Sequence, residues 1–269
     1  MTALDLTEVS VRLGGAPIVS DVTVSVPEGE WLTVIGPNGA GKSTLLSAIA
    51  GLLPVSGGTI ACFGTPMRAL SRRDRARRVA VVPQNPVVPP GLTVFAYVLL
   101  GRTPHVPPLG RESAADLDVV WRVCTRLDLT GFAGRRLETL SGGERQRVFL
   151  ARALAQLSGA NEAILLLDEP TTALDIGHQQ EVMELVDTLR AADGLTVVST
   201  MHDLSIAGEY ADRLVLLSRG RTAAVGPPSS VLTDRALAEH YGAHVRVIDG
   251  ESGPIIVPVR RPSATEESG

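Results

Sequence analysis

Two stretches near the start of the chain, residues 3–12 and 18–26, alternate apolar and polar positions. This period of two is typical of strands with one buried face. Residues 14–17, Gly-Gly-Ala-Pro, separate the stretches and are typical of a turn. The pattern therefore predicts a small antiparallel sheet at the start of the chain.

A second pattern consists of short, continuous apolar runs, which are typical of strands buried on both faces. We expect such strands at residues 31–35, 79–82, 164–167, 195–200 and 213–217, and a further strand at 59–63. Helical periodicity falls between them, at residues 43–50, 178–192, 205–210 and 234–241. Strands that alternate with helices indicate an α/β fold with a parallel, doubly wound sheet.

The pattern changes between residues 86 and 157. Prolines break up the chain around Gln84, and a helix that is apolar all round follows, from a cap at Thr93 to Gly101. An all-apolar helix is either buried or covered by a partner. Residues 113–157 read as helical throughout, with one predicted apolar stripe consisting of Leu117, Val120, Trp121 and Cys124. We interpret residues 86–157 as a helical subdomain inserted into an α/β core of residues 1–85 and 158–245.

Composition narrows the class of protein. The 269 residues are 44% hydrophobic and 20% charged, with a net charge of -4, which gives no reason to expect nucleic acid as a partner. Residues 68–78 carry six arginines, for which a solvated helix face is favoured over an anion contact. The two cysteines are far apart and predict reduced thiols. No segment approaches the roughly 18–20 apolar residues that span a bilayer, so we expect a soluble protein.

The C-terminal end differs from the rest. Beyond residue 250 the chain is rich in Pro, Ser and Glu. We therefore expect residues 246–269 to form an extension outside the main domain of residues 1–245. Part of it, residues 263–269, is expected to be disordered.

A glycine-rich stretch lies between the predicted strand 31–35 and the helix that follows it. It matches the phosphate-binding pattern G-x-x-x-x-G-K-[ST]. The candidate nucleotide-binding residues are Gly36, Pro37, Asn38, Gly39, Ala40, Gly41, Lys42, Ser43 and Thr44. Glycines let several backbone N–H groups point at one anion, and the helix dipole favours phosphate. Lys42 can reach the β- and γ-phosphates, and the Ser43 hydroxyl can ligate Mg²⁺.

A carboxylate pair follows the apolar strand 164–167. Asp168 ends the strand, as in a Walker B motif, and is a candidate ligand of Mg²⁺. Glu169 projects differently and is a candidate for orienting and deprotonating the attacking water. A phosphate loop alone fits a kinase, a GTPase or a motor, whereas this pair points to nucleotide hydrolysis.

A serine and two glycines, Ser141, Gly142 and Gly143, open the long helix before that strand. They predict a second helix N-terminus that can bind an anion, although a plain N-cap explains the serine as well. One copy has no use for two such sites on one γ-phosphate. Two copies packed head to tail do, because each can offer Ser141 to the nucleotide on the other.

With these motifs in this order, the chain resembles the ATP-binding cassette (ABC) ATPases. The resemblance covers residues 3–245 and rests most specifically on Leu-Ser-Gly-Gly-Glu-Arg-Gln at 140–146. It implies a P-loop NTPase core with an antiparallel β subdomain and the inserted helical subdomain. It also implies that Gln84 contacts Mg²⁺ and the attacking water, that His202 contacts the γ-phosphate, and that Asp175 lies at the seam of a homodimer.

One position departs from the family pattern. The family usually carries an aromatic residue that stacks on adenine where this chain has Leu13. Leucine offers apolar contact without stacking, which leaves adenine selectivity open. Trp31 lies on a different predicted strand and is expected in the core.

Finer likeness points to importer cassettes for iron-siderophore, cobalamin or haem uptake. It is carried by residues 99–105, 174–181 and 240–242. The resemblance implies ATP and Mg²⁺ as cofactors and a peripheral position on the cytoplasmic face of the membrane. It also implies two permease subunits and a binding protein that delivers the substrate. Because residues 94–100 are all apolar, we hypothesise that residues 84–101 form the groove that receives a short cytoplasmic helix of the permease. The alternatives are a non-transport ABC ATPase and a regulatory protein without turnover; Glu169 and His202 argue against the second.

Overall fold

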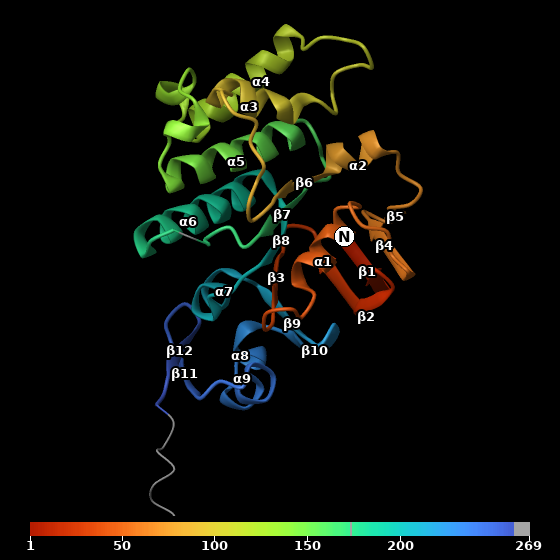
Figure 1. Cartoon of the computed structure of the whole chain (residues 1–269), viewed down its shortest axis with the longest axis vertical. Coiled ribbons are helices and arrows are strands. Elements are labelled where there is room, and N and C mark those ends of the chain that lie inside the picture. Colours follow the sequence, from red (N-terminus) through yellow and green to blue (C-terminus); the bar gives the residue numbers. More distant parts are fainter. Residues whose placement is uncertain (173, 261–269) are drawn as a thin grey trace, which may run out of the picture.

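A computed structural model describes residues 1–172 and 174–260 of the chain. Its centre is a six-stranded sheet of order β10-β9-β3-β8-β7-β6 (Figure 1). The strands are β3 (Trp31–Ile35), β6 (Val79–Val82), β7 (Ile164–Asp168), β8 (Thr196–Thr200), β9 (Arg213–Ser218) and β10 (Arg221–Gly226). All neighbours pair in parallel except β10, which returns antiparallel to β9. The α/β fold and the buried strands predicted from the apolar runs are confirmed.

A second sheet has the order β2-β1-β4-β5 and lies beside the core. Its strands are β1 (Thr2–Leu13), β2 (Ala16–Pro27), β4 (Gly57–Cys62) and β5 (Thr65–Pro66). The predicted antiparallel pairing is confirmed, but the turn is only Gly14-Gly15, both with positive φ, because Ala16 and Pro17 already pair with β1.

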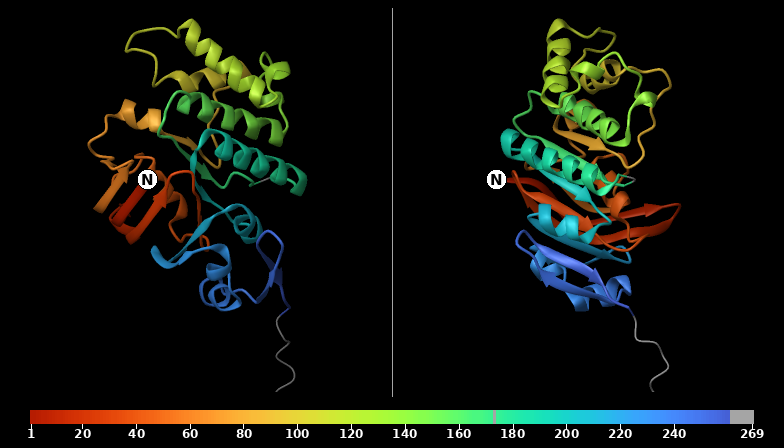
Figure 2. Two further views of the ribbon diagram at one scale, coloured as in Figure 1. Left: turned by 180° about the vertical axis from the view of Figure 1, so that it is seen from behind. Right: turned by 90° about the vertical axis from the view of Figure 1, so that its left-hand side faces the viewer.

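The helices of the core connect its strands and cover the sheet (Figure 2). They are α1 (Lys42–Ile49), α2 (Arg72–Arg78), α6 (Ile176–Asp193), α7 (Leu204–Tyr210), α8 (Pro228–Val231) and α9 (Asp234–Tyr241). The arginine-rich α2 is more than a solvated face. Arg73 and Arg77 donate to the backbone carbonyl of Pro104 at 2.7 and 3.0 Å, so α2 binds the segment that follows α3.

The helical region contains α3 (Val94–Leu99), α4 (Ala114–Arg126) and α5 (Gly142–Leu157). Short 3-10 turns η1 (Leu100–Arg102), η2 (Thr130–Phe132) and η3 (Leu137–Thr139) connect them. Thr93 caps α3 as expected, but Gly101 is not a C-cap. A Cβ there would lie 2.3 Å from the carbonyl oxygen of Arg152, so this glycine permits close packing of η1 on α5.

The predicted stripe on α4 is half wrong. Val120 and Cys124 are buried, whereas Leu117 and Trp121 are 38% and 46% exposed. The inward face includes Asp116, whose carboxylate pairs with buried Arg102 at 2.9 Å. The helix is therefore rotated relative to the orientation that hydrophobicity alone predicts.

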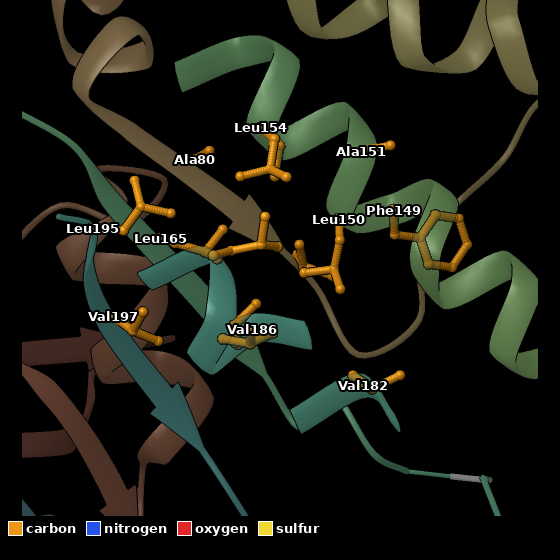
Figure 3. Close-up of a cluster of buried hydrophobic side chains, with 14 of the residues drawn as sticks. Ala80, Phe149, Leu150, Ala151, Leu154, Leu165, Val182, Val186, Leu195 and Val197 are labelled. Atoms are coloured by element: carbon orange, nitrogen blue, oxygen red, sulfur yellow. The ribbon is translucent and has the colours of Figure 1, made fainter. Parts of the chain in front are cut away.

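Residues 80–197 contribute a continuous apolar core around β6, β7 and β8. In Figure 3, Leu150 and Leu154 of α5 and Val186 of α6 lie around Leu165 of β7. This packing joins α5 to the strand that ends in Asp168. Helix α5 begins within residues 140–146, Leu-Ser-Gly-Gly-Glu-Arg-Gln, which we call the signature. Both cysteines are buried and reduced, as predicted.

The region after residue 245 is better ordered than its composition suggests. Strands β11 (Val245–Asp249) and β12 (Pro254–Pro258) form a hairpin that packs on α7 and α9. The expected tail at 263–269 lies outside the described residues. In the part of the chain that the structure covers, no helix is long and apolar enough to cross a membrane.

Candidate nucleotide-hydrolysis site

The phosphate loop links β3 to α1, as the motif requires. Gly41 is the left-handed N-cap of α1, and a Cβ there would lie 3.0 Å from the carbonyl oxygen of Ile18. Gly36 is packed still more closely, because its Cβ would lie 2.2 Å from the carbonyl oxygen of Leu217. The loop therefore needs glycine at both ends, for backbone conformation and for space.

Lys42 folds back over the loop. Its Nζ donates to the carbonyl oxygens of Gly36 at 2.8 Å and Pro37 at 3.3 Å. Burial lowers the pKa of Lys42, and the carboxylates of Glu169 and Asp168 oppose that shift. The ammonium is thus held in the loop by neutral carbonyls, and phosphate oxygens would be stronger partners.

Ser43 and Asp168 meet across the site from α1 and β7. The Ser43 hydroxyl donates to Asp168 Oδ1 at 3.0 Å, and Thr200 Oγ1 donates to the same oxygen at 2.6 Å. Among the described residues, no group of three or more His, Cys, Asp or Glu side chains could hold a metal. Mg²⁺ does not require one, because it binds through one or two protein oxygens together with phosphate and water. The Ser43 and Asp168 oxygens fit that chemistry.

Glu169 has different partners from the residue beside it. Its φ of 49° is left-handed, and its side chain is only 7% exposed. Oε2 accepts hydrogen bonds from Gln84 Nε2 and, at 3.2 Å, from Thr172 Oγ1, while Oε1 lies 2.5 Å from His202 Nε2. The turn therefore separates a carboxylate beside Ser43 from a carboxylate held by Gln84 and His202.

Two residues at this site were not predicted from the sequence. Thr200, at the end of β8, donates to Asp168 and accepts from the Glu169 backbone N–H at 3.0 Å. The hydroxyl of Tyr241, in α9, is buried near the backbone of Gly36 with no hydrogen-bond partner among the described residues, and burial raises the pKa of this phenol. Thr200 ends a strand that the sequence predicts, but its contact with Asp168 follows from the register of β7 with β8, which the sequence does not specify. Nothing local indicated that α9 reaches the phosphate loop.

The signature residues form a second group. Ser141 is the N-cap of α5: its Oγ accepts from the Glu144 N–H at 3.2 Å, and Glu144 accepts from the Ser141 N–H at 2.8 Å. A Cβ on Gly143 would lie 2.5 Å from the ring of His178. The glycines therefore let α5 begin against the start of α6.

Asp175 caps α6 beside this group. Its Oδ1 accepts from the His178 N–H at 3.0 Å and lies 2.8 Å from His178 Nδ1, and these contacts lower the pKa of Asp175. Within residues 1–172 and 174–260, no recorded hydrogen bond or ion pair joins Ser141, Gly142, Gly143 or Asp175 to the phosphate loop. Ser141 and Asp175 are exposed to solvent.

A cavity of about 400 Å³ lies between the loop after β6 and the start of α5. Gln84 and Val88 line one side, and Gly142, Phe149 and Leu174 line others. The loop after β6 thus contacts both Glu169 and the space beside the signature residues.

Leu13 is the position at which the resemblance to the family places the nucleotide base. Leu13 ends β1 and is 41% exposed. Trp31 is fully buried, as predicted, and packs against Tyr210 with ring centroids 6.0 Å apart, so it is closed to a base. The phosphate loop is therefore enclosed by many more contacts than the surface around Leu13.

A glycine-rich loop that feeds a helix, with a carboxylate at the end of another parallel strand of the same sheet, defines a P-loop nucleotide hydrolase. Comparison with known proteins specifies the family. Residues 19–172 match the model of the ABC transporter family. The chain belongs to this family and is an ATP-binding cassette ATPase.

Several relatives extend over nearly the whole chain. The hemin import ATP-binding protein HmuV of Rhodococcus jostii is 43% identical over 94% of this chain and 85% of its own length. The cobalamin import ATP-binding protein BtuD of Halobacterium salinarum is 42% identical over 98% of this chain, which spans only 66% of that protein. The ferric enterobactin transport ATP-binding protein FepC of Escherichia coli is 35% identical over 94% of this chain and 93% of its own length.

Solved structures agree on the fold. A cassette of an ABC transporter assigned to the metal-chelate type, in an inward-facing conformation, matches with a TM-score of 0.83 and 27% identity, over 97% of this chain and 99% of that one. A dimeric cassette in a post-hydrolysis state with ADP and Pi matches with a TM-score of 0.71 and 28% identity, over 84% and 98%.

Proposed function

We propose that this chain is the ATP-hydrolysing subunit of an importer for metal chelates, an iron chelate, haem or cobalamin. Two copies would lie head to tail, with two transmembrane permease subunits above them on the cytoplasmic face of the membrane. A binding protein would deliver the chelate outside. The names of the relatives support this substrate class, and the iron-siderophore assignment made from the sequence is one member of it.

The observation that carries the proposal is the division of the site. Lys42, Ser43 and Asp168 are held together within one copy, whereas Ser141 is exposed and separated from them. In the proposed dimer, each phosphate loop holds ATP, and residues 141–143 of the other copy cover the γ-phosphate. Asp175, exposed at the start of α6, would lie at the seam.

The chemistry follows from the partners of Glu169. Gln84 and His202 hold its carboxylate where it can orient the attacking water and accept a proton. Ser43 and Asp168, with Gln84, would hold Mg²⁺, which neutralises developing phosphate charge when it is bound. Loss of the γ-phosphate contacts would then open the dimer, and the permeases would follow.

The permease contact is proposed more narrowly than the sequence suggested. Helix α3 is largely internal, since Val94, Tyr97 and Val98 are buried against α4 and α5. The exposed apolar side chains in this region are Val87 at 94% and Leu100 at 44%. We therefore assign the docking surface to the loop after β6 and the end of α3.

Uptake in cells that lack this chain tests the proposal. Labelled haem, cobalamin and a ferric siderophore would be offered to cells complemented with the native chain or with Glu169→Gln. We expect uptake of one chelate with the native chain and loss of uptake with the variant. Normal uptake of all three chelates without the chain, and no multi-span protein copurifying with it from membranes, would overturn the proposal.

A further inference from the structure

The C-terminal hairpin β11–β12 carries an apolar surface that nothing in the described chain covers. We call it the outer hairpin face; it consists of Ile248, Ile255, Val257 and Val259, which are 48%, 48%, 38% and 47% exposed. The register pairs Ile248 with Ile255, so both side chains lie on the same side of the hairpin. Val257 and Val259 follow Ile255 at a spacing of two and continue that surface.

The opposite face of the hairpin packs on the main core through Val245, Val247 and Ile256, and hydrogen bonds anchor its edges. The backbone N–H of Ile256 donates to Ser205 Oγ at 3.2 Å, and that of Val247 donates to Asp234 Oδ1 at 2.6 Å. A Cβ on Gly253 would lie 2.3 Å from the carbonyl oxygen of Gly208, so the turn packs directly on α7. The outer hairpin face is therefore held in a fixed orientation.

Its position relates it to the nucleotide site. Helix α7 begins at Leu204, two residues after His202. The right-hand view of Figure 2 shows α6, α7 and the hairpin along one side of the molecule. Asp175 caps the start of α6, so the hairpin continues the side that, in the proposed function, meets the second copy.

Charge is distributed unevenly along the hairpin. Arg246 and Arg260 lie at its open end, and Asp249 and Glu251 lie at its turn. Arg246 lies three residues before Asp249, a distance of about 10 Å along β11, and Glu251 lies beyond Asp249 in the turn. Two hairpins placed antiparallel would set the acidic turn of one against the basic end of the other, with the apolar side chains between them.

We infer that the outer hairpin face binds the same face of a second copy, around the two-fold axis of the cassette dimer. The contact rests on the proposed head-to-tail dimer and adds to it. A patch of four side chains is small beside the roughly 1,200–2,000 Å² that a stable interface buries. It therefore supplements the nucleotide-dependent interface and helps keep the copies together when the ATP sites open.

Sedimentation of the full chain in the Glu169→Gln background, with and without ATP and Mg²⁺, tests this inference. We expect Ile248→Glu/Ile255→Glu to raise the dimer dissociation constant about tenfold or more, because it buries like charges. The control Leu109→Glu/Val225→Glu introduces the same charge at apolar positions that are 107% and 40% exposed, and should change little. Unchanged association of the hairpin variant would overturn the inference.

Charge reversal separates a contact between copies from damage to the fold. Arg246→Glu should weaken the dimer, and adding Glu251→Arg should restore it, since these side chains are too far apart to pair within one hairpin. Failure of the double variant to recover, with its melting temperature unchanged, would also count against the contact. If the parent itself gains no association from ATP, the head-to-tail proposal fails instead, and any remaining association that the hairpin variant abolishes would belong to the hairpin alone.

Discussion

The phosphate-binding region and the signature region contain the same kind of element, a helix N-terminus with glycines and a serine, yet their surroundings differ. Around the loop, Ser43, Asp168 and Thr200 form a chain of hydrogen bonds, and Glu169 is buried between Gln84 and His202. At the signature, the hydrogen bonds of Ser141 to described residues stay within the first turn of α5, and Ser141 is exposed. The first region is preorganised for chemistry, and the second presents a surface. This contrast supports a site completed by two copies.

The largest effect on ATP hydrolysis is expected from a change to the Glu169 carboxylate. Glu169→Gln should lower kcat for ATP hydrolysis by roughly 10²–10⁴, a usual contribution of a general base, while ATP binding persists. Phosphate release at saturating ATP measures it. Glu162→Gln, which alters a surface partner of Arg78, serves as the control. Hydrolysis at the native rate in Glu169→Gln would remove Glu169 from its proposed role.

The next variant addresses the exposed region. Ser141→Arg should raise the dissociation constant of the ATP-dependent dimer at least tenfold, because a long cation would block the surface that meets the second copy. Binding of ATP to the monomer should remain. Ser71→Arg removes the N-cap of α2 in the same way and controls for the loss of a cap. Equal dimerisation of both variants would contradict the contrast between the two regions.

Stability should depend on a buried pair that holds η1 to α4. Asp116→Asn removes the negative charge that pairs with buried Arg102 and should destabilise the chain by about 3 kcal/mol, measured by denaturant unfolding. Asp118→Asn, on the exposed side of α4, should change stability by less than about 0.5 kcal/mol. A small effect at Asp116 would show that this pair does not fix the rotation of α4.

The same pair predicts a pH dependence. Hydrogen bonds from Ser113, followed by the contact with Arg102, lower the pKa of Asp116 from 3.8 to about 2. Because the folded-state pKa is the lower one, this stabilisation is present above pH 3.8 and is lost as the pH falls toward 2. Asp116→Asn should flatten unfolding free energy against pH in that window, and an unchanged slope would exclude the carboxylate as its source.

The smallest expected effect is on ATP affinity and comes from contact with the adenine base. Leu13→Tyr supplies an aromatic face and should tighten ATP binding by about 0.5–1.5 kcal/mol, or two- to twelvefold. The native chain should discriminate weakly between ATP and GTP. Leu109→Tyr adds the same ring at another exposed position. Strong discrimination by the native chain would mean that another group reads the base.

The sequence predicted the parts of the fold that depend on local patterns. Continuous apolar runs such as residues 164–167 specify buried strands, and the loop motif needs only its own glycines. The rotation of α4 was not predictable in this way, because Asp116 faces inward to meet a residue 14 positions away. The local pattern predicted that Gly101 ends a helix, but glycine is needed there because the Arg152 carbonyl oxygen leaves no room for a side chain. The C-terminal hairpin was missed because its short strands are stabilised by α7 and α9.

The site residues also divide into those that local motifs predict and those that depend on packing. Lys42, Ser43 and Asp168 could be named from motifs, since motif spacing encodes local geometry. Thr200 and Tyr241 could not, because their contacts depend on the register of β7 with β8 and on the packing of α9.

Mixing two defective chains tests the central claim most directly. In the Glu169→Gln background, Lys42→Ala lacks a working loop and Ser141→Arg lacks a working signature surface, so neither should dimerise alone in ATP and Mg²⁺. An equal mixture should form mixed dimers, because the loop of one chain and the signature of the other make one intact site. Differently tagged chains that copurify only with ATP would give that result. A mixture that stays monomeric, or either variant that dimerises alone as the parent does, would contradict the account.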